Sequence, residues 1–160
     1  MPKKTLNVAV VGSRGFDRLD WVRDAMPQVF RALALEYPKR KLVVYSGGAQ
    51  GVDAEIASLV RRRFSETMKV VEVLPDWAAH GRSAGIVRNE EIVNAADIVI
   101  AFWDGKSPGT KNSIDRALFA GKRLYVVRRF FQGRTSLHVN DPIVSALSAT
   151  IGATLPPWMA

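Results

Sequence analysis

Two glycine-rich segments, SGGAQGVD at residues 46–53 and GKSPGT at residues 105–110, contain residue types that bind phosphate groups. Glycines let backbone N–H groups approach a ligand closely, and each segment leads into helical periodicity, so the positive end of a helix would face an anion. The second segment is not a Walker A motif, because the first glycine of that motif would fall at position 100, which is Ile100. We therefore predict an anion nest at a helix N-terminus. Simple tight turns between strands and helices are the alternative.

A third glycine segment, GSRG at residues 12–15, follows the first apolar run. It is not a dinucleotide fingerprint, which would need glycines at positions 14 and 17, where the chain has Arg14 and Asp17. Ser13 and the planar guanidinium of Arg14 are candidates to hold a phosphate. A surface ion pair is the alternative for Arg14. Asp53 lies early in a helical stripe, where a carboxylate suits either the helix dipole or a ribose hydroxyl.

Further candidates lie in the segment DWAAHGRSAGIVRN, residues 76–89. Trp77 is expected in a loop, where it would stack on a base, although packing is the commoner role of a tryptophan. Arg82 and Arg88 stand near the start of a weak helical stripe. Arg88 is followed by Asn89 beside apolar neighbours, and we interpret it as facing a pocket. A helix-surface arginine is the alternative.

Five strand-like runs alternate with four helical stripes and would position these segments. The runs are short and β-branched, and they span residues 6–11, 41–45, 69–74, 97–103 and 123–127. Four helical stripes are expected: Val22 to Leu33, Val52 to Phe64, about Ser83 to Ala95, and around Ile114 to Leu118. Asp20 is expected to be the N-cap of the first helix, and Gly121 is expected to close the fourth. This order predicts an α/β fold: a single doubly wound Rossmann-like domain whose mainly parallel sheet has at least five strands flanked by helices.

Ligands of open parallel sheets bind outside the carboxyl ends of the strands, and the glycine segments all follow strands. We therefore predict one pocket at this edge. Its expected ligand-binding residues are Gly12, Ser13, Arg14, Ser46, Gly47, Gly48, Asp53, Asp76, Trp77, Arg82, Arg88, Asn89, Gly109, Thr110 and Ser113.

The composition argues against a metalloprotein and against a membrane-spanning protein. A chain of 160 residues suits one domain, and it contains no cysteine and only His80 and His138, so we expect no metal site. The sequence identifies no cofactor, and a nucleotide-type ligand is expected. The formal net charge of +8 favours anionic partners, with ordinary surface chemistry as the alternative. The N-terminal apolar run indicates a first strand rather than a signal peptide, and no run approaches a membrane span of about 18 apolar residues. We expect a cytoplasmic protein without a membrane partner.

The domain is expected to cover residues 1–127. The pattern weakens in a C-terminal tail, residues 128–160, which contains one short helical stretch from Ile143 to Thr150. The tail is expected to pack on the core or on a neighbouring subunit, and the sequence does not decide between these.

Taken together, the motifs resemble the SLOG superfamily, the Rossmann-like group that includes DprA/Smf and LONELY GUY proteins, and most of all its small YspA-like branch. The resemblance runs from Val8 to Val127 and rests on the order and spacing of five motifs: G-S-R at residues 12–14, S-G-G-A-x-G-x-D at 46–53, D-W at 76–77, R-N at 88–89 and G-T at 109–110.

The resemblance implies a nucleotide or nucleotide-derived ligand, such as AMP or an ADP-ribose-like compound, bound by a sensor or ligand-binding protein that forms a homo-oligomer. A phosphoribohydrolase that cleaves an N-glycosidic bond is the first alternative. The LONELY GUY motif P-G-G-x-G-T-x-x-E has a glutamate where this chain has Ser113, so Arg88 and Asp53 are the candidates if it is an enzyme. DprA-like binding of single-stranded DNA is the second alternative.

Overall fold

The computed structural model describes residues 3–128, 131–134 and 141–151, and its centre is one six-stranded sheet. The spatial order is β3-β2-β1-β4-β5-β6; the first five strands are parallel and β6 is antiparallel to β5. The predicted fold class is therefore confirmed. The strands are β1 (Thr5–Gly12), β2 (Lys41–Ser46), β3 (Lys69–Glu72), β4 (Ile98–Phe102), β5 (Arg123–Val127) and β6 (Phe131–Arg134).

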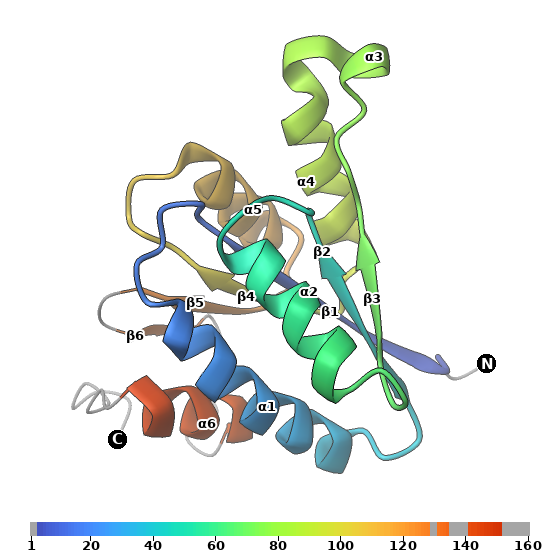
Figure 1. Cartoon of the computed structure of the whole chain (residues 1–160), viewed down its shortest axis with the longest axis vertical. Coiled ribbons are helices and arrows are strands. Elements are labelled where there is room, and N and C mark those ends of the chain that lie inside the picture. The colour runs from blue at the N-terminus through green and yellow to red at the C-terminus, as the bar shows by residue number, and fades with distance from the viewer. Residues whose placement is uncertain (1–2, 129–130, 135–140, 152–160) are drawn as a thin grey trace.

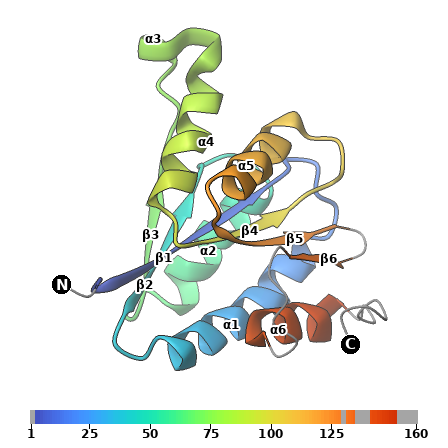
Figure 2. The same ribbon diagram turned by 180° about the vertical axis from the view of Figure 1, so that it is seen from behind.

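Helices cover both faces of this sheet (Figures 1 and 2). They are α1 (Leu19–Glu36), α2 (Val52–Arg63), α3 (Trp77–His80), the 3-10 turn η1 (Gly81–Ser83), α4 (Ala84–Ala95), α5 (Pro108–Phe119) and α6 (Pro142–Ile151). One face is covered by α1, α2 and α6, and the other by α4 and α5. Strand β4 has every residue buried, as a central strand covered on both faces requires.

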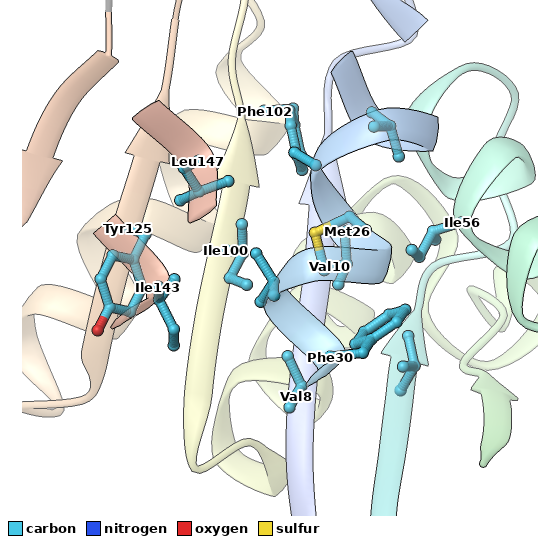
Figure 3. Packing of buried hydrophobic residues seen from close by; sticks show 14 of the residues in the cluster. Val8, Val10, Met26, Phe30, Ile56, Ile100, Phe102, Tyr125, Ile143 and Leu147 are labelled. Atoms are coloured by element: carbon cyan, nitrogen blue, oxygen red, sulfur yellow. The ribbon is translucent and has the colours of Figure 1, made fainter. Parts of the chain in front are cut away.

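The larger core lies between the sheet and α1 (Figure 3). Apolar side chains at alternate positions of β1 and β4 point to this face, because successive side chains of a strand point to opposite sides. They meet one apolar stripe from each of α1, α2 and α6. The core includes Val8, Val10, Met26, Phe30, Ile56, Ile100, Phe102, Ile143 and Leu147.

The C-terminal segment belongs to the same core. Asp141, which is 5% exposed, caps α6 by accepting a hydrogen bond from the N–H of Ile143 at 2.9 Å. Its carboxylate also accepts hydrogen bonds from the hydroxyl of Tyr125 and the guanidinium of Arg123. Arg123 reaches Glu36 of α1 at 2.8 Å as well, so one polar network ties β5, α6 and α1 together.

Three local expectations differ from the structure. Asp20 is not the N-cap of α1, because the helix begins at Leu19 and Arg18 is its N-cap; Asp20 lies in the first turn and pairs with Arg18 at 2.7 Å. Strand β3 ends at Glu72 rather than at position 74, because the strand that it pairs with, β2, ends at Ser46. Trp77 begins the short helix α3 and is not in a loop. Gly121 has φ +65° after α5, as expected for the residue that closes a helix.

None of the helices in the described part of the chain is long and apolar enough to span a membrane.

Candidate ligand-binding site

A cavity of about 500 Å³ lies at the carboxyl ends of the strands. The loops after β1, β2 and β4 and the first half of α4 surround it. Strand order reverses between β1 and β4, and ligands of doubly wound sheets bind at such a switch point. Most of the residues predicted for ligand binding line this cavity: Gly12, Arg14, Gly47, Asp53, Trp77, Arg82, Arg88, Asn89, Gly109, Thr110 and Ser113.

Two glycines hold the start of α2 close against the loop after β1. A Cβ atom on Gly12 would lie 2.5 Å from the Cβ of Val52, so no larger residue fits between β1 and α2. Gly51 has φ +79°, and a Cβ atom there would lie 2.9 Å from the carbonyl oxygen of Arg14. The backbone therefore requires glycine at position 51, and this close packing brings Arg14 and the N-terminus of α2 to the same cavity.

Gly47 lies between a cation and an anion. The guanidinium of Arg88 donates a hydrogen bond to the carbonyl oxygen of Gly47 at 2.5 Å. A Cβ atom on Gly47 would lie 2.6 Å from Nη1 of Arg88 and 2.9 Å from Oδ2 of Asp53. The missing side chain thus lets Arg88 and Asp53, from α4 and α2, approach each other across the loop after β2.

Asp53 is a buried carboxylate in this cavity, with 6% of its surface exposed. Its Oδ2 accepts a hydrogen bond from the N–H of Ala49 at 3.2 Å. Burial raises the pKa of Asp53 to about 6, although the N–H of Ala49 and the charge of Arg88 act in the opposite direction. The folded protein therefore holds this carboxylate at an energetic cost near neutral pH, as functional sites often do.

Positive charge converges on the cavity. Burial lowers the pKa of Arg88; the Asp53 carboxylate opposes this, and the like charge of Arg14 adds to it. Arg14 and Arg88 are therefore close enough to repel one another across the cavity. Arg82, exposed on η1, adds a third cation to the lining. An anion between these guanidinium groups would relieve the repulsion.

The N-terminus of α5 forms another wall of the cavity and is held by its own loop. The carboxylate of Asp104 accepts hydrogen bonds from the N–H groups of Lys106 and Ser107, both at 2.8 Å. Desolvation alone would raise the pKa of Asp104, but these N–H groups outweigh it and the pKa is lowered. Ser107 caps α5, and the hydroxyl of Ser13 contacts Thr110 at 3.3 Å, which joins the start of α5 to the loop after β1.

Asn89 joins α4 to α5. Its side-chain amide donates to the carbonyl oxygen of Gly109 at 3.2 Å and contacts Oδ1 of Asn112 at 3.4 Å. It also accepts a hydrogen bond from Nε of Arg88 at 3.1 Å. These two neighbouring residues therefore connect two walls of the cavity, since Arg88 is bonded to the loop after β2 and Asn89 is bonded to the start of α5.

The last wall is an arm that projects from the body of the protein and consists of α3, η1 and the first half of α4 (Figure 1). Neither α3 nor η1 has a buried residue. Trp77 is 59% exposed and Ile86 is 50% exposed, and both line the cavity. Trp77 therefore does not belong to the core, and its ring offers an apolar surface at the cavity rim.

Four predicted residues do not line the cavity but support its walls. Ser13 is buried and accepts a hydrogen bond from the N–H of Asp104 at 3.2 Å. Ser46 is buried beneath Asp53 and contacts its carbonyl oxygen at 3.5 Å. Gly48 turns the chain with φ +69° against Leu74. Asp76 caps α3 through the N–H of Ala79 at 3.0 Å.

Sequence reasoning missed several residues that line the cavity, among them Ser107 and Ile86. A serine directly before Pro108 is a recognisable signal for an N-cap followed by proline in the first helical turn. No sequence signal marked Ile86, because its exposure depends on the arm. Among the described residues, no three histidine, aspartate or glutamate side chains form a group that would hold a metal ion.

A doubly wound sheet with a polar cavity at its switch point defines the chain as a Rossmann-like domain. The chain belongs to the family of the Gene 61 protein of Mycobacterium phage D29, with which it shares 37% identity over 120 residues, 71% of this chain and 90% of that protein. No family model matches the sequence.

Two solved structures share the fold. DNA processing protein A (DprA) from Streptococcus pneumoniae has a TM-score of 0.59 at 19% identity, over 96% of this chain and 59% of that chain. DprA from Helicobacter pylori, described as binding single-stranded DNA, has a TM-score of 0.55 at 19% identity, over 94% of this chain and 75% of that chain. These likenesses show that the chain shares the fold of the DprA structures, and the SLOG resemblance drawn from the motifs stays a prediction.

Proposed function

We propose that the cavity binds a nucleotide or a nucleotide-derived ligand through its phosphate. The observation that carries this proposal is the convergence of Arg14 and Arg88 with the N-termini of α2 and α5 on one cavity. Guanidinium groups and helix N-termini are both suited to phosphate oxygens. A cavity of about 500 Å³ falls within the range of small-ligand sites, which supports a mononucleotide-sized ligand.

The walls of the cavity suggest how such a ligand would lie. Its phosphate would face Arg14 and the start of α5, where Thr110 and Gly109 form the lining. Its base would lie against the exposed ring of Trp77 on the arm. Asp53 is placed to accept a hydrogen bond from a ribose hydroxyl, and this hydrogen bond would offset part of the free-energy cost of burying the carboxylate.

Equilibrium titrations with AMP and with ribose 5-phosphate test both ends of this arrangement. Arg14→Gln should weaken both ligands by about tenfold or more, because a charged hydrogen bond contributes roughly 1.5–3 kcal/mol. Trp77→Ala should weaken AMP by about fivefold or more and leave ribose 5-phosphate unchanged, because stacking contributes roughly 1–3 kcal/mol per base.

Arg23→Gln is the matched control, since Arg23 is an exposed cation of α1 outside the cavity. It should change neither affinity. Unchanged affinity of Arg14→Gln for AMP would contradict the proposal. Chromatography of the same mixtures would detect free adenine, the product expected of a phosphoribohydrolase.

Binding of single-stranded DNA is a second candidate, supported by the shared fold with DprA and by the net charge of +8. In this case a nucleotide within a strand would enter the same cavity, with its neighbours following the surface. Binding through several phosphates weakens steeply as salt increases. An oligothymidylate whose affinity is independent of salt, or unaffected by Arg14→Gln, would contradict this use of the cavity.

A further inference from the structure

The end of the sheet opposite the cavity carries a separate cluster of cations. Chain segments 3–4 and 39–41 read Lys-Lys and Lys-Arg-Lys, and they lead into the neighbouring strands β1 and β2. The strands are parallel and pair from Thr5 with Lys41, and the N–H of Lys41 donates to the carbonyl oxygen of Lys4 at 2.9 Å. The two segments therefore lie side by side. We call Lys3, Lys4, Lys39, Arg40 and Lys41 the amino-end basic surface.

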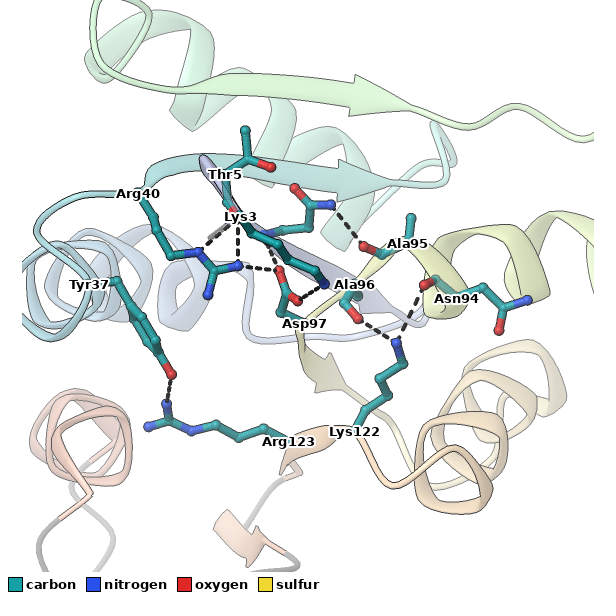
Figure 4. Close-up of polar contacts among 11 residues, drawn as sticks. Lys3, Thr5, Tyr37, Arg40, Asn94, Ala95, Ala96, Asp97, Lys122 and Arg123 are labelled. Carbon is teal, nitrogen blue, oxygen red and sulfur yellow. Dashed lines mark hydrogen bonds and ion pairs between the residues drawn. The ribbon is translucent and has the colours of Figure 1, made fainter. Parts of the chain in front are cut away.

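Asp97 provides the carboxylate that forms ion pairs with cations of this surface. Asp97 accepts hydrogen bonds from Nζ of Lys3 at 2.8 Å and from a guanidinium nitrogen of Arg40 at 3.0 Å (Figure 4). Within the described part of the chain, Lys4, Lys39 and Lys41 have no carboxylate within ion-pair distance, and all three are exposed. Three cations of the cluster are thus left without a counter-charge.

This end of the sheet therefore carries a larger net positive charge than the lining of the candidate ligand site. The cavity at the carboxyl ends is lined by three arginines, but also by Asp53 and Asp104. The amino-end basic surface has five cations against Asp97 alone. Like charges on neighbouring strands repel each other, and Lys4 and Lys41 lie at the starts of the paired strands β1 and β2. Lys4, Lys39 and Lys41 form no ion pair within the described part of the chain that would stabilise the fold.

The shape and the lining of this surface favour a polyanion over a lipid bilayer as its partner. A second cavity of about 500 Å³ lies here, lined by Lys3, Lys4, Tyr37, Pro38, Lys39 and Arg40. The guanidinium of Arg40 lies 5.3 Å from the centre of the Tyr37 ring. The lining contains four cations, one aromatic ring and Pro38, with no leucine, isoleucine, valine or phenylalanine to insert into a bilayer, and it is concave where a lipid surface is flat.

We infer that the amino-end basic surface binds the phosphate backbone of a nucleic acid without reading its sequence. Backbone phosphates are polyanions that cations neutralise with release of counterions, and this supplies most of non-specific affinity. This site is distinct from the nucleotide cavity at the other end of the sheet, and the inference does not depend on the function proposed for that cavity.

The test compares two charge-matched double variants of the full chain. Lys39→Gln/Lys41→Gln removes two cations from the surface, and Arg23→Gln/Arg31→Gln removes two exposed cations from α1. Binding of an oligothymidylate and of a duplex, each of about 20 nucleotides per strand, is measured over a series of salt concentrations. The lysine variant should weaken oligothymidylate binding by about tenfold or more at about 0.1 M salt. The slope of log affinity against log salt concentration should become shallower by about 1.4, because each of the two lost cations contributes about 0.7 on a single strand.

The arginine control should stay within about twofold of the wild type, and the AMP affinity of the lysine variant should be unchanged. Equal weakening by both double variants would overturn the inference, because net charge alone would then explain binding. Loss of oligonucleotide binding only in Arg14→Gln would also overturn it and would place the nucleic acid in the cavity instead. Binding to phosphatidylserine vesicles without binding to either oligonucleotide would replace the partner with a lipid surface.

Discussion

Replacing Asp53 by asparagine should stabilise the protein near neutral pH. Asp53 is 6% exposed, and burial raises its pKa to about 6 from the ordinary value of 3.8. Because the pKa is higher in the folded chain than in the unfolded chain, the folded state binds this proton more tightly. Stability from this residue is therefore complete below about pH 3.8 and is lost as the pH rises to about 6. An asparagine, which cannot ionise, should avoid that loss.

The size of the stabilisation expected for Asp53→Asn follows from the pKa shift of Asp53. About 2.2 pKa units at roughly 1.4 kcal/mol each give about 3 kcal/mol of stabilisation at about pH 7.5. The attraction between Asp53 and Arg88 is already contained in this figure, since Arg88 is one of the charges that set the pKa. For a domain of this size, the melting temperature should rise by about 6–12 °C.

Urea denaturation of the wild type and of Asp53→Asn, at about pH 4 and about pH 7.5, measures this difference. The two proteins should have nearly equal stability at the lower pH and differ by about 3 kcal/mol at the higher one. Asp24→Asn, at an exposed position of α1, is the matched control and should show no such pH dependence. A variant that is less stable than the wild type at about pH 7.5, or a difference independent of pH, would refute the reasoning.

Three further substitutions test the walls of the cavity and the C-terminal network. Gly47→Ala should abolish AMP binding in titrations while keeping most of the helical circular dichroism, because the new Cβ would displace Arg88 or Asp53; wild-type affinity would contradict the close contact. Ser107→Ala should lower the free energy of unfolding by about 1 kcal/mol through loss of the cap of α5, and an unchanged urea midpoint would count against capping. Asp141→Ala should cost about 3–5 kcal/mol, because the cation and hydroxyl of β5 lose their buried partner; a cost below about 1 kcal/mol would show that the network is dispensable.

The sequence was sufficient for the five parallel strands and the longer helices, because their signals are local and periodic, but it did not predict the antiparallel strand β6. Continuous apolar runs and alternating helical stripes set the order of strands and helices, and the short helix in the tail was recognised from the same periodicity as α6. Capping was less predictable, because α1 begins at Leu19, ahead of the apolar stripe that starts at Val22, so Asp20 lies inside the first turn. The arm was also missed as a feature, since α3 has only four residues and contributes nothing to the core.

The candidate site was partly predictable, because loops that follow parallel strands must meet at one edge of the sheet. This rule alone placed Arg14, Gly47 and Thr110 together, although they lie far apart in the chain. The burial of Asp53 and its resulting pKa depend on how α2 and α4 pack across Gly47, and no local pattern shows that packing. The finer assignment to the YspA-like branch and the homo-oligomer stay predictions.

The measurement that tests the proposed function most directly is the melting temperature of the wild type with AMP, ADP-ribose and NAD. A ligand at a hundredfold excess over its dissociation constant adds about 2.7 kcal/mol to the free energy of unfolding. For a domain of this size, the melting temperature should rise by about 5–11 °C with at least one of these compounds, and the rise should disappear in Arg14→Gln. No rise with any of the three compounds would contradict a nucleotide-binding cavity.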